Sequence, residues 1–286
     1  MARLLSWLTP RGAGIAFIVL VLLQISYLLF PNNQHQEPFQ SSSHEDSRRD
    51  TVLQLADLTQ SYISHNVNSS ISLVLASVRT DDLTWLLEHC KESGNIPFVY
   101  STDDFAEHGL LIPPTRRGRE SPAYLSYIVD FYDHLPAYSI FIHASPEQWH
   151  NDLFGPMTLK ALNSLRLESV DVHGYVNLRC QHNPGCPTGV HPLTPSQSDI
   201  DAHDIRAYFS KAYQQIHGVP ADKVPGEIGN VCCGQFAVSR ERILTRPKED
   251  YERILKWAAT TDLTDDFGVG WVLEKMWHII FGMDAV

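Results

Sequence analysis

Strand-length apolar runs that alternate with helical segments constrain the fold of this chain more than any other feature. The first three runs are ISLVLASV at 71–78, IPFVY at 96–100 and YSIFI at 138–142. The segments at 81–90 and 121–135 carry apolar residues at helical spacing, and Pro122 suits the first turn of a helix. Because strands alternate with helices, we predict one α/β domain with a parallel or mixed sheet flanked by helices.

The second half of the chain has a looser pattern of the same kind. The predicted elements are helices at 157–166, 201–217, within 246–259 and at 271–281, and strands at 174–178 and 234–239. A Pro-rich loop at 179–199 interrupts them, and its length is unusual in a compact domain. This loop is therefore either functional or contains an element that the pattern does not reveal.

An uncharged, apolar segment at 12–30 precedes the domain. As a helix it would be roughly 28 Å long, close to the hydrocarbon thickness of a bilayer, so we predict a transmembrane helix. Arg3 and Arg11 precede it and acidic residues follow it, which predicts a cytoplasmic tail at 1–11 and a lumenal remainder. A cleaved signal peptide is the alternative, but the run is long and no small-residue cleavage motif follows it.

The chain is thus expected to be a type II single-pass membrane protein of the ER or Golgi. Residues 31–69 are polar and predict a flexible stem, although weak helical periodicity at 52–62 leaves open whether that part packs on the domain. Asn68 begins an Asn-Ser-Ser glycosylation motif. Residues 70–286 then form the lumenal α/β domain, a length that one domain commonly fills.

Charge and cysteine content narrow the possible partners and bonds. A net charge of −11 argues against nucleic acid, which needs a basic face on the protein. In an oxidising lumen we expect a disulfide among Cys180, Cys186, Cys232 and Cys233. Either Cys180 pairs with Cys186, or one of them pairs with one of the adjacent Cys232 and Cys233, which more easily bridge outward than to each other.

Several blocks of the sequence resemble the signature of a fungal membrane-anchored family of unassigned function. They are GRESPAYLSYIVDFYDHLP, FIHASPEQWH, GYVNLRC, CCGQFAVSRERI and LEKMWHIIFG, and they extend from about Ile71 to Gly282. A more distant resemblance is to nucleotide-sugar glycosyltransferases with the GT-A fold. It is carried by ISLVLASV, by GQFAVSRERI with KEDYERIL, and by the helix of Glu274 and Trp277. It implies a Rossmann-like mixed sheet and transfer of a sugar from a nucleotide-sugar donor to a glycan or small-molecule acceptor.

The same distant resemblance implies a divalent metal ion, Mn²⁺ or Mg²⁺, bound at an Asp-x-Asp motif after a central strand. This chain has His143-Ala144-Ser145 at that place. The DID sequence at 199–201 follows a loop and not a strand, so we interpret it as a helix cap. Metal dependence therefore stays open.

Polar residues at strand ends are candidates for donor binding, because open α/β sheets bind ligands at the carboxyl ends of their strands. His143 ends the third strand, where an imidazole can move a proton, bind a metal or hold a phosphate, or simply cover the strand end. The donor-binding candidates are Asp103, Asp104, Arg119, Glu120, Arg179 and Gln235. Each has a structural alternative: a turn or cap for the aspartates, a solvated loop for the charged loop residues, and a tie between loops for Gln235.

Aromatic and acidic residues complete the predicted site. Trp149 and Trp277 are candidates for an aromatic wall against a sugar or a base, or they are core residues. Glu274 and His278 are four residues apart and would share a helix face. Glu274 is our candidate general base, with His278 and His143 as further catalytic candidates. An ion pair between Glu274 and His278 on a packed helix is the structural alternative.

We therefore expect a glycosyltransferase-like lumenal domain. The first alternative is a non-catalytic module of the same fold that binds a glycan or a protein. The second is a His-rich metal-dependent hydrolase that uses His143, His150 and His173, which spacing alone does not establish.

Overall fold

The computed structural model describes residues 39–65 and 69–286 of the chain. The tail and the transmembrane helix predicted at 1–30 lie outside the described residues, and so does Asn68. No helix in the described part is both long and apolar enough to span a membrane. The chain divides into two compact units, Met1–Glu45 and Asp46–Val286, and the α/β fold belongs to the second.

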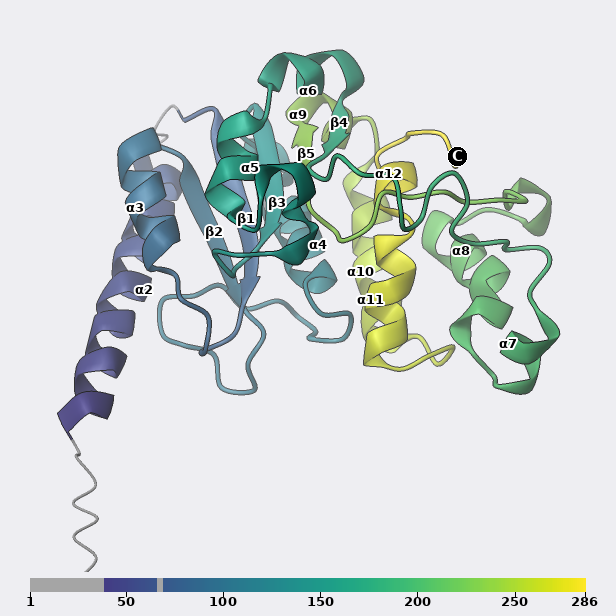
Figure 1. Ribbon diagram of the computed structural model, residues 1–286, viewed down its shortest axis with the longest axis horizontal. Coiled ribbons are helices and arrows are strands. Elements are labelled where there is room, and N and C mark those ends of the chain that lie inside the picture. Colours follow the sequence, from purple (N-terminus) through teal and green to yellow (C-terminus); the bar gives the residue numbers. More distant parts are fainter. Residues whose placement is uncertain (1–38, 66–68) are drawn as a thin grey trace, which may run out of the picture. The chain divides into compact units, whose positions relative to one another are not determined.

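A five-stranded mixed sheet forms the centre of this unit (Figure 1). Its strands are β1 (Ile71–Ser77), β2 (Ile96–Ser101), β3 (Tyr138–His143), β4 (Tyr175–Asn177) and β5 (Phe236–Ser239). They lie in the order β2-β1-β3-β5-β4, with β2, β1 and β3 parallel and β5 antiparallel to both of its neighbours. The mixed α/β fold predicted from the sequence is thus confirmed.

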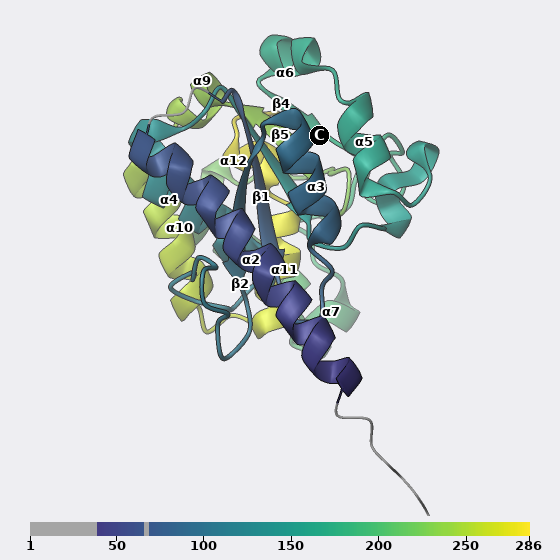
Figure 2. The same ribbon diagram turned by 90° about the vertical axis from the view of Figure 1, so that its left-hand side faces the viewer.

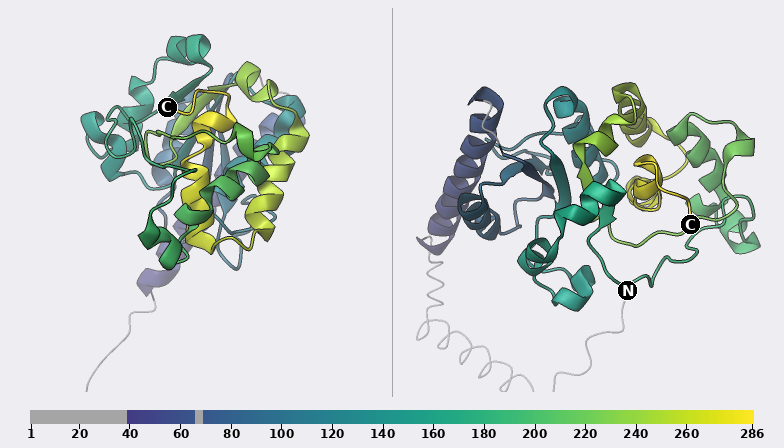
Figure 3. Two further views of the ribbon diagram at one scale, coloured as in Figure 1. Left: turned by 90° about the vertical axis from the view of Figure 1, so that its right-hand side faces the viewer. Right: turned by 90° about the horizontal axis from the view of Figure 1, so that it is seen from above.

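Helices cover both faces of the sheet (Figures 2 and 3). One face carries α2 (Phe39–His65), α3 (Thr84–Ser93), α5 (Thr158–Ser164) and α6 (Leu167–His173). The other carries α4 (Ser121–Phe131), α10 (Lys248–Thr260), α11 (Asp266–Glu274) and α12 (Trp277–Ile280), and α8 (Phe209–His217) packs against α10 on the side away from the sheet. Short helices and 3₁₀ turns complete the described chain: α7 (Gln197–Asp201), α9 (Arg240–Leu244), η1 (Tyr132–His134), η2 (Trp149–Phe154), η3 (Ile205–Tyr208) and η4 (Ala221–Lys223).

The side chains of β1 show why both faces need helices. Val74 packs into the core on the α4 side, whereas Leu73 and Leu75 pack into the core on the α3 side. Because successive side chains of a strand point to opposite faces, a continuous apolar run fills two cores at once. The uninterrupted apolar run that predicted this strand is therefore the signature of a sheet covered on both sides.

Helix α2 shows that 52–62, for which the sequence left packing open, packs on the domain and is not part of a flexible stem; 31–38 and 66–68 of the predicted stem lie outside the described residues. Its side chains Val52 and Leu55 are buried in the core on the α3 side of the sheet. The Thr59 hydroxyl donates a hydrogen bond to the Pro97 carbonyl in β2. The apolar stripe is narrow, so the polar composition of the whole segment conceals it.

The second half of the chain departs most from the sequence-based prediction. The helix expected at 201–217 is divided into the end of α7, the turn η3 and helix α8. The last helix, expected at 271–281, starts earlier at Asp266 and is interrupted between α11 and α12. The Pro-rich segment 178–196 has neither helix nor strand, and Val190 within it forms an isolated bridge with Ile228. Because these helices are divided, side chains that the sequence placed on one helix now lie on separate elements.

Candidate functional site

Five chain segments meet at one edge of the sheet. Strands β1, β2, β3 and β4 end at this edge, and β5 begins there because it alone runs in the opposite direction. The chain passes from β1 to β2 over one face through α3, and from β2 to β3 over the other face through α4. Open α/β sheets bind ligands where successive connections diverge in this way, here outside the ends of β1 and β3. We call this edge the carboxyl edge.

Gln235, directly before β5, is the centre of a buried polar network at the carboxyl edge. Its side chain is 3% exposed. Its Oε1 accepts a hydrogen bond from the His143 N–H at 3.2 Å, and its Nε2 donates to Asn151 Oδ1 at 3.0 Å and contacts His150 Nδ1 at 3.3 Å. The amide is thus engaged with three groups, which favours the tie between loops over direct contact with a ligand.

Two histidines flank this amide in different states of exposure. Burial, with smaller contributions from His143 and Arg179, lowers the pKa of His150 to about 4, so its imidazole is neutral at physiological pH. The His143 ring is partly exposed, lies 5.2 Å from the His150 ring between centroids, and contacts the Cys233 carbonyl through Nε2 at 2.9 Å. A carbonyl accepts, so Nε2 carries the proton. In neutral His143, Nδ1 is then a hydrogen-bond acceptor.

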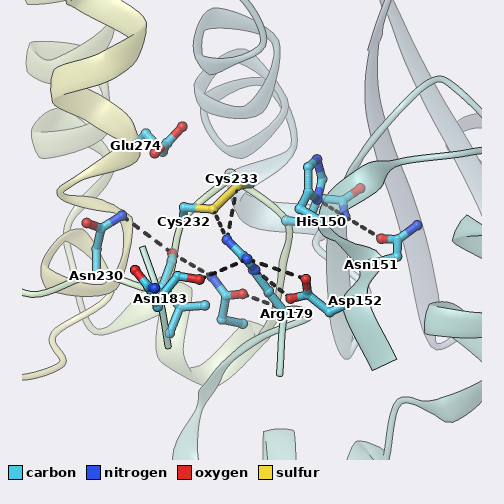
Figure 4. Close-up of a disulfide and its surroundings, with 12 residues drawn as sticks. His150, Asn151, Asp152, Arg179, Asn183, Asn230, Cys232, Cys233 and Glu274 are labelled. Carbon is cyan, nitrogen blue, oxygen red and sulfur yellow. Dashed lines mark hydrogen bonds and ion pairs between the residues drawn. A yellow bond between two sulfur atoms is a disulfide. The ribbon is translucent and has the colours of Figure 1, made fainter. Parts of the chain in front are cut away.

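Arg179, two residues after β4, is buried and held by an ion pair (Figure 4). Its Nε lies 2.5 Å from Asp152 Oδ2, and its Nη2 donates to Asp152 Oδ1 at 3.3 Å and to the Asn183 carbonyl at 3.0 Å. The guanidinium carbon lies 5.1 Å from the centre of the Trp149 ring, which is itself 69% exposed. Arg179 therefore supports an exposed indole, and its own donors are largely occupied.

A disulfide joins the adjacent residues Cys232 and Cys233, which Figure 4 shows beside Arg179. The Arg179 Nη1 contacts the Cys232 sulfur and lies 3.8 Å from the Cys233 sulfur. Cys180 and Cys186 are free thiols. This structure differs from the prediction: neither Cys180 nor Cys186 is bridged, and the adjacent cysteines pair with each other instead of outward. Cys233 has a positive φ of 90°, a conformation that allows the chain to turn sharply before β5.

Asp103 and Asp104, which follow β2, have in this protein the structural roles that are the alternatives to donor binding. The Asp103 carboxylate accepts a hydrogen bond from the Arg79 N–H at 2.7 Å, as a turn cap does. Asp104 is exposed and lies 3.7 Å from the Arg116 guanidinium. Both lie at the carboxyl edge, yet their carboxylates serve different partners and do not converge.

Arg119 and Glu120 lie directly before α4 at the same edge. Arg119 is exposed, and its guanidinium carbon lies 4.7 Å from the centre of the Phe267 ring on α11. It forms no ion pair within the described residues 39–65 and 69–286. Glu120 reaches across to Gly234, where an added Cβ would lie 3.1 Å from its Oε1. The start of α4 thus carries a cation that stacks on α11 and a carboxylate that lies beside the segment leading into β5.

The break between α11 and α12 separates the two catalytic candidates of the last helix. Helix α11 ends at Glu274, whose carboxylate pairs with the Lys275 ammonium at 3.0 Å. Figure 4 includes Glu274 among the surroundings of the disulfide. His278 lies in α12, where burial lowers its pKa and its presence contributes to the low pKa of His217. The shared helix face predicted for Glu274 and His278 is therefore wrong.

Trp277 belongs to the core and not to an aromatic wall. Its side chain is 2% exposed. Its ring packs against Tyr124, Phe236 and Phe281, with centroid distances of 5.9, 5.3 and 6.3 Å. Of the two predicted wall residues, only Trp149 has a face open to solvent.

The residues do not fit the metal sites that were considered. His173 precedes β4, at the edge opposite His143 and His150, so the three histidines do not meet. Across residues 39–65 and 69–286, no three His, Cys, Asp or Glu side chains come together in a group that could hold a metal ion. Neither the hydrolase centre nor an aspartate-based Mn²⁺ or Mg²⁺ site is formed by these side chains.

Sequence reasoning missed Asn151 and Asp152, which directly follow the singled-out Trp149 and His150. Asn151 is buried, accepts from Gln235, and donates to the Pro156 carbonyl at 2.8 Å. Asp152 has a positive φ of 52°, which is uncommon for a residue other than glycine. The run of polar and aromatic side chains at 149–152, which follows a buried strand, was the sequence signal by which Asn151 and Asp152 could have been found.

A hollow of about 1070 Å³ lies at the opposite, amino edge of the sheet. Residues from the end of α2, from η1 and from the start of α9 line it, including Tyr62, Tyr132, His134 and Arg240. None of the site residues singled out from the sequence lines this hollow. This hollow is the alternative ligand site, so an experiment on ligand binding has to distinguish it from the carboxyl edge.

A family match covers the carboxyl edge. Residues 73–286 match the family described as "Protein of unknown function (DUF3431)". No curated protein and no solved structure matches the chain. The matched region contains Gln235, His143, Arg179 and Trp149, together with nearly all of the sheet. The chain therefore belongs to the DUF3431 family, whose function is unknown.

Proposed function

We propose that the domain binds a nucleotide sugar at the carboxyl edge and transfers the sugar to an acceptor hydroxyl. The observation that carries this proposal is Trp149, whose 69% exposed indole is supported by the buried Arg179. An aromatic ring that is fixed on one side and open on the other is a stacking surface for a sugar or a base. The sequence resemblance to GT-A glycosyltransferases narrows the ligand class to nucleotide sugars.

The neighbouring groups suit the other parts of such a donor. His143 offers Nδ1 as an acceptor for a hydroxyl group of the ligand. Arg119 and the first turn of α4 lie at the same edge, and α4 is 11 residues long. A guanidinium stabilises a diphosphate through charge-assisted hydrogen bonds. The Ser121 N–H at the start of α4 already donates to the Gly118 carbonyl, and Pro122 has no N–H. Because the carboxylates do not form a metal site, charge neutralisation is assigned to Arg119.

The chemistry would be a displacement at the anomeric carbon. The acceptor oxygen attacks this carbon, the bond to the diphosphate oxygen breaks, and that oxygen leaves with the electron pair. Glu274 takes the proton of the acceptor hydroxyl, a contribution that is typically worth about 10²–10⁴-fold in rate. Its carboxylate lies 3.0 Å from the Lys275 ammonium, at the end of α11.

A thermal unfolding screen of the full chain with uridine- and guanosine-diphosphate sugars tests the proposal. A donor present at 100 times its dissociation constant should stabilise the fold by about 2.7 kcal/mol. Trp149→Ala should remove most of this shift, whereas Val172→Ala, at an equally exposed apolar position on α6, should retain it. The proposal fails if no nucleotide sugar shifts the unfolding midpoint of the wild-type chain.

A binding module without catalysis remains the second candidate, and one observation favours it. Arg179 and Gln235 are held by protein groups and are not free for a ligand. A module of this kind would bind a glycan without consuming a nucleotide sugar. Release of nucleoside diphosphate in the presence of an acceptor, lost in Glu274→Gln, distinguishes transfer from binding alone.

A further inference from the structure

Two loops that carry four of the five cysteines lie side by side at the carboxyl edge. The Leu178 N–H donates to the Gln235 carbonyl at 3.0 Å, and the Asn230 N–H donates to the Gly185 carbonyl at 3.0 Å. These contacts hold 178–185 beside 230–235. The cysteines on or next to these segments are Cys180 and Cys186 on one loop and Cys232 and Cys233 on the other. We call the contact between the two loops the cysteine seam.

The cysteine seam contains both reactants of a thiol–disulfide exchange. Cys232 and Cys233 form the disulfide, while Cys180 and Cys186 are thiols. When a thiolate attacks a disulfide sulfur, one disulfide replaces another and the number of electrons is unchanged. Such a reaction within one chain therefore needs no outside oxidant or reductant.

The two sulfurs of the disulfide differ in access and in environment. Cys232 is buried against the Arg179 guanidinium, whereas Cys233 is partly exposed. A positive charge stabilises a thiolate, and a stabilised thiolate is the better leaving group. The geometry therefore favours attack on the Cys233 sulfur and departure of the Cys232 sulfur.

The two thiols also differ in position. Cys186 follows Gly185, whose carbonyl is bonded to the loop that carries the disulfide, and Cys186 is partly buried. Burial raises the pKa of the Cys186 thiol, and the nearby Lys275 ammonium opposes this effect. Cys180 is exposed to solvent. Both thiols thus border the cysteine seam, Cys186 as the partly buried one next to the contact between Gly185 and Asn230, and Cys180 as the exposed one, which serves for comparison.

We propose that the cysteine seam is a thiol–disulfide exchange site in which Cys186 attacks the Cys232–Cys233 disulfide. The Cys186 thiolate forms a bond to the Cys233 sulfur, and the bond between the Cys232 and Cys233 sulfurs breaks. The electron pair of that bond leaves on the Cys232 sulfur, next to Arg179. The Cys232 thiolate then takes up the proton that Cys186 lost.

The product would bind the Pro-rich loop covalently to the turn before β5. The Cys233 carbonyl is the partner of His143 Nε2, so the new bond acts on a residue that orients an imidazole of the candidate site. The exchange is measured on the cysteines themselves. Its outcome is therefore independent of whether the carboxyl edge binds a nucleotide sugar.

Peptide mapping of the unreduced, alkylated full chain tests the proposal. Trypsin would place Cys180 and Cys186 in peptide 180–206, and Cys232 and Cys233 in peptide 224–240. Exchange links these two peptides, whereas the local disulfide leaves them separate. We expect the linked pair to form in the native wild-type chain before alkylation. Below the thiol pKa, its rate of formation should rise about tenfold for each unit by which the pH is raised, because the thiolate is the attacking species.

Three cysteine variants test which thiol attacks the disulfide. Cys186→Ser should abolish the linked pair, and Cys180→Ser should retain it. In Cys232→Ser, where no local disulfide can form, oxidised glutathione should drive a bond between Cys186 and Cys233. The proposal is overturned if the linked pair is missing from both the wild type and Cys232→Ser, or if Cys186→Ser still forms it. Circular dichroism spectra that match the wild type show that each variant is folded.

Discussion

The two sides of the carboxyl edge differ in how their polar side chains find partners. On the side of β2, Asp103 and Asp104 each bond to one nearby group at the surface. On the side of β3, β5 and β4, Gln235 and Arg179 are buried and connect segments that are distant in sequence. Polar residues at strand ends are thus insufficient to mark a site. Buried polar groups that require each other are the stronger indication.

The largest expected difference is between two arginines. Arg179→Ala would leave the Asp152 carboxylate buried without its partner, which typically costs about 3–5 kcal/mol of unfolding free energy. Arg116→Ala removes the exposed pair with Asp104 and should cost about 0–1 kcal/mol. Urea unfolding of both variants measures the difference. Equal losses would show that the two sides of the edge are not distinct.

A smaller loss is expected at Gln235. Gln235→Leu keeps the volume but leaves the His143 N–H and the Asn151 side-chain carbonyl without partners, at about 1–3 kcal/mol in unfolding free energy. Asp103→Asn, the control on the β2 side, keeps an acceptor for its backbone donor and should change stability by less than about 0.5 kcal/mol. The same urea titration compares the two variants. If Gln235→Leu is as stable as Asp103→Asn, the hydrogen bonds of Gln235 do not hold the two loops together.

The pH dependence of stability isolates His150. Its pKa is lowered to about 4 in the fold, so the unfolded chain binds more protons below its ordinary pKa of 6.5. Stability should therefore fall as the pH drops from 6.5 towards 4. Because the imidazole of the unfolded chain is only about half protonated at pH 6.5, the expected loss between pH 6.5 and 5.5 stays below the full value of about 1.4 kcal/mol per unit.

The variant His150→Asn separates this effect from the other histidines. Burial also lowers the pKa of His217, to about 3, and the pKa of His278, and both remain in the variant. Unfolding free energies at both pH values should fall more steeply for the wild type than for His150→Asn. Parallel pH profiles would mean that His150 is not the group that titrates.

The smallest change in stability is expected at Trp149, although its effect on binding is the largest. Trp149→Ala exposes no new apolar core and should change the unfolding free energy by about 0.5 kcal/mol or less. Loss of a stacked base or sugar should weaken donor binding by about 1–3 kcal/mol. Calorimetric titration and urea unfolding of the same sample separate these quantities. A large loss of stability with unchanged binding would make Trp149 a structural residue.

The sequence predicted the sheet well because its strands are continuous apolar runs filled on both faces. Val74 and its neighbours in β1 are an example, and the location of His143 at a strand end followed directly from the end of such a run. Gln235 was singled out because an amide within an apolar strand needs partners. These predictions depend only on local spacing and on the polarity of one strand.

The predictions that failed depended on contacts between distant segments. The interruption at Lys275 and Met276 separates Glu274 from His278, and no helix-breaking residue announces it. The pairing of Cys232 with Cys233 needs a backbone turn that adjacent cysteines rarely adopt. The ion pair of Arg179 with Asp152 joins residues 27 positions apart. Local periodicity contains no information about such partners.

Hydrogen-exchange mass spectrometry of the full chain with and without a nucleotide sugar tests the central claim most directly. If the ligand binds at the carboxyl edge, backbone amides at 143–152 and 230–236 should exchange more slowly in its presence. Amides at 62–64 and 131–137, which border the hollow at the amino edge, should be unchanged. Slower exchange confined to the amino edge, or no change at 143–152 with a sugar that stabilises the fold, would contradict the account.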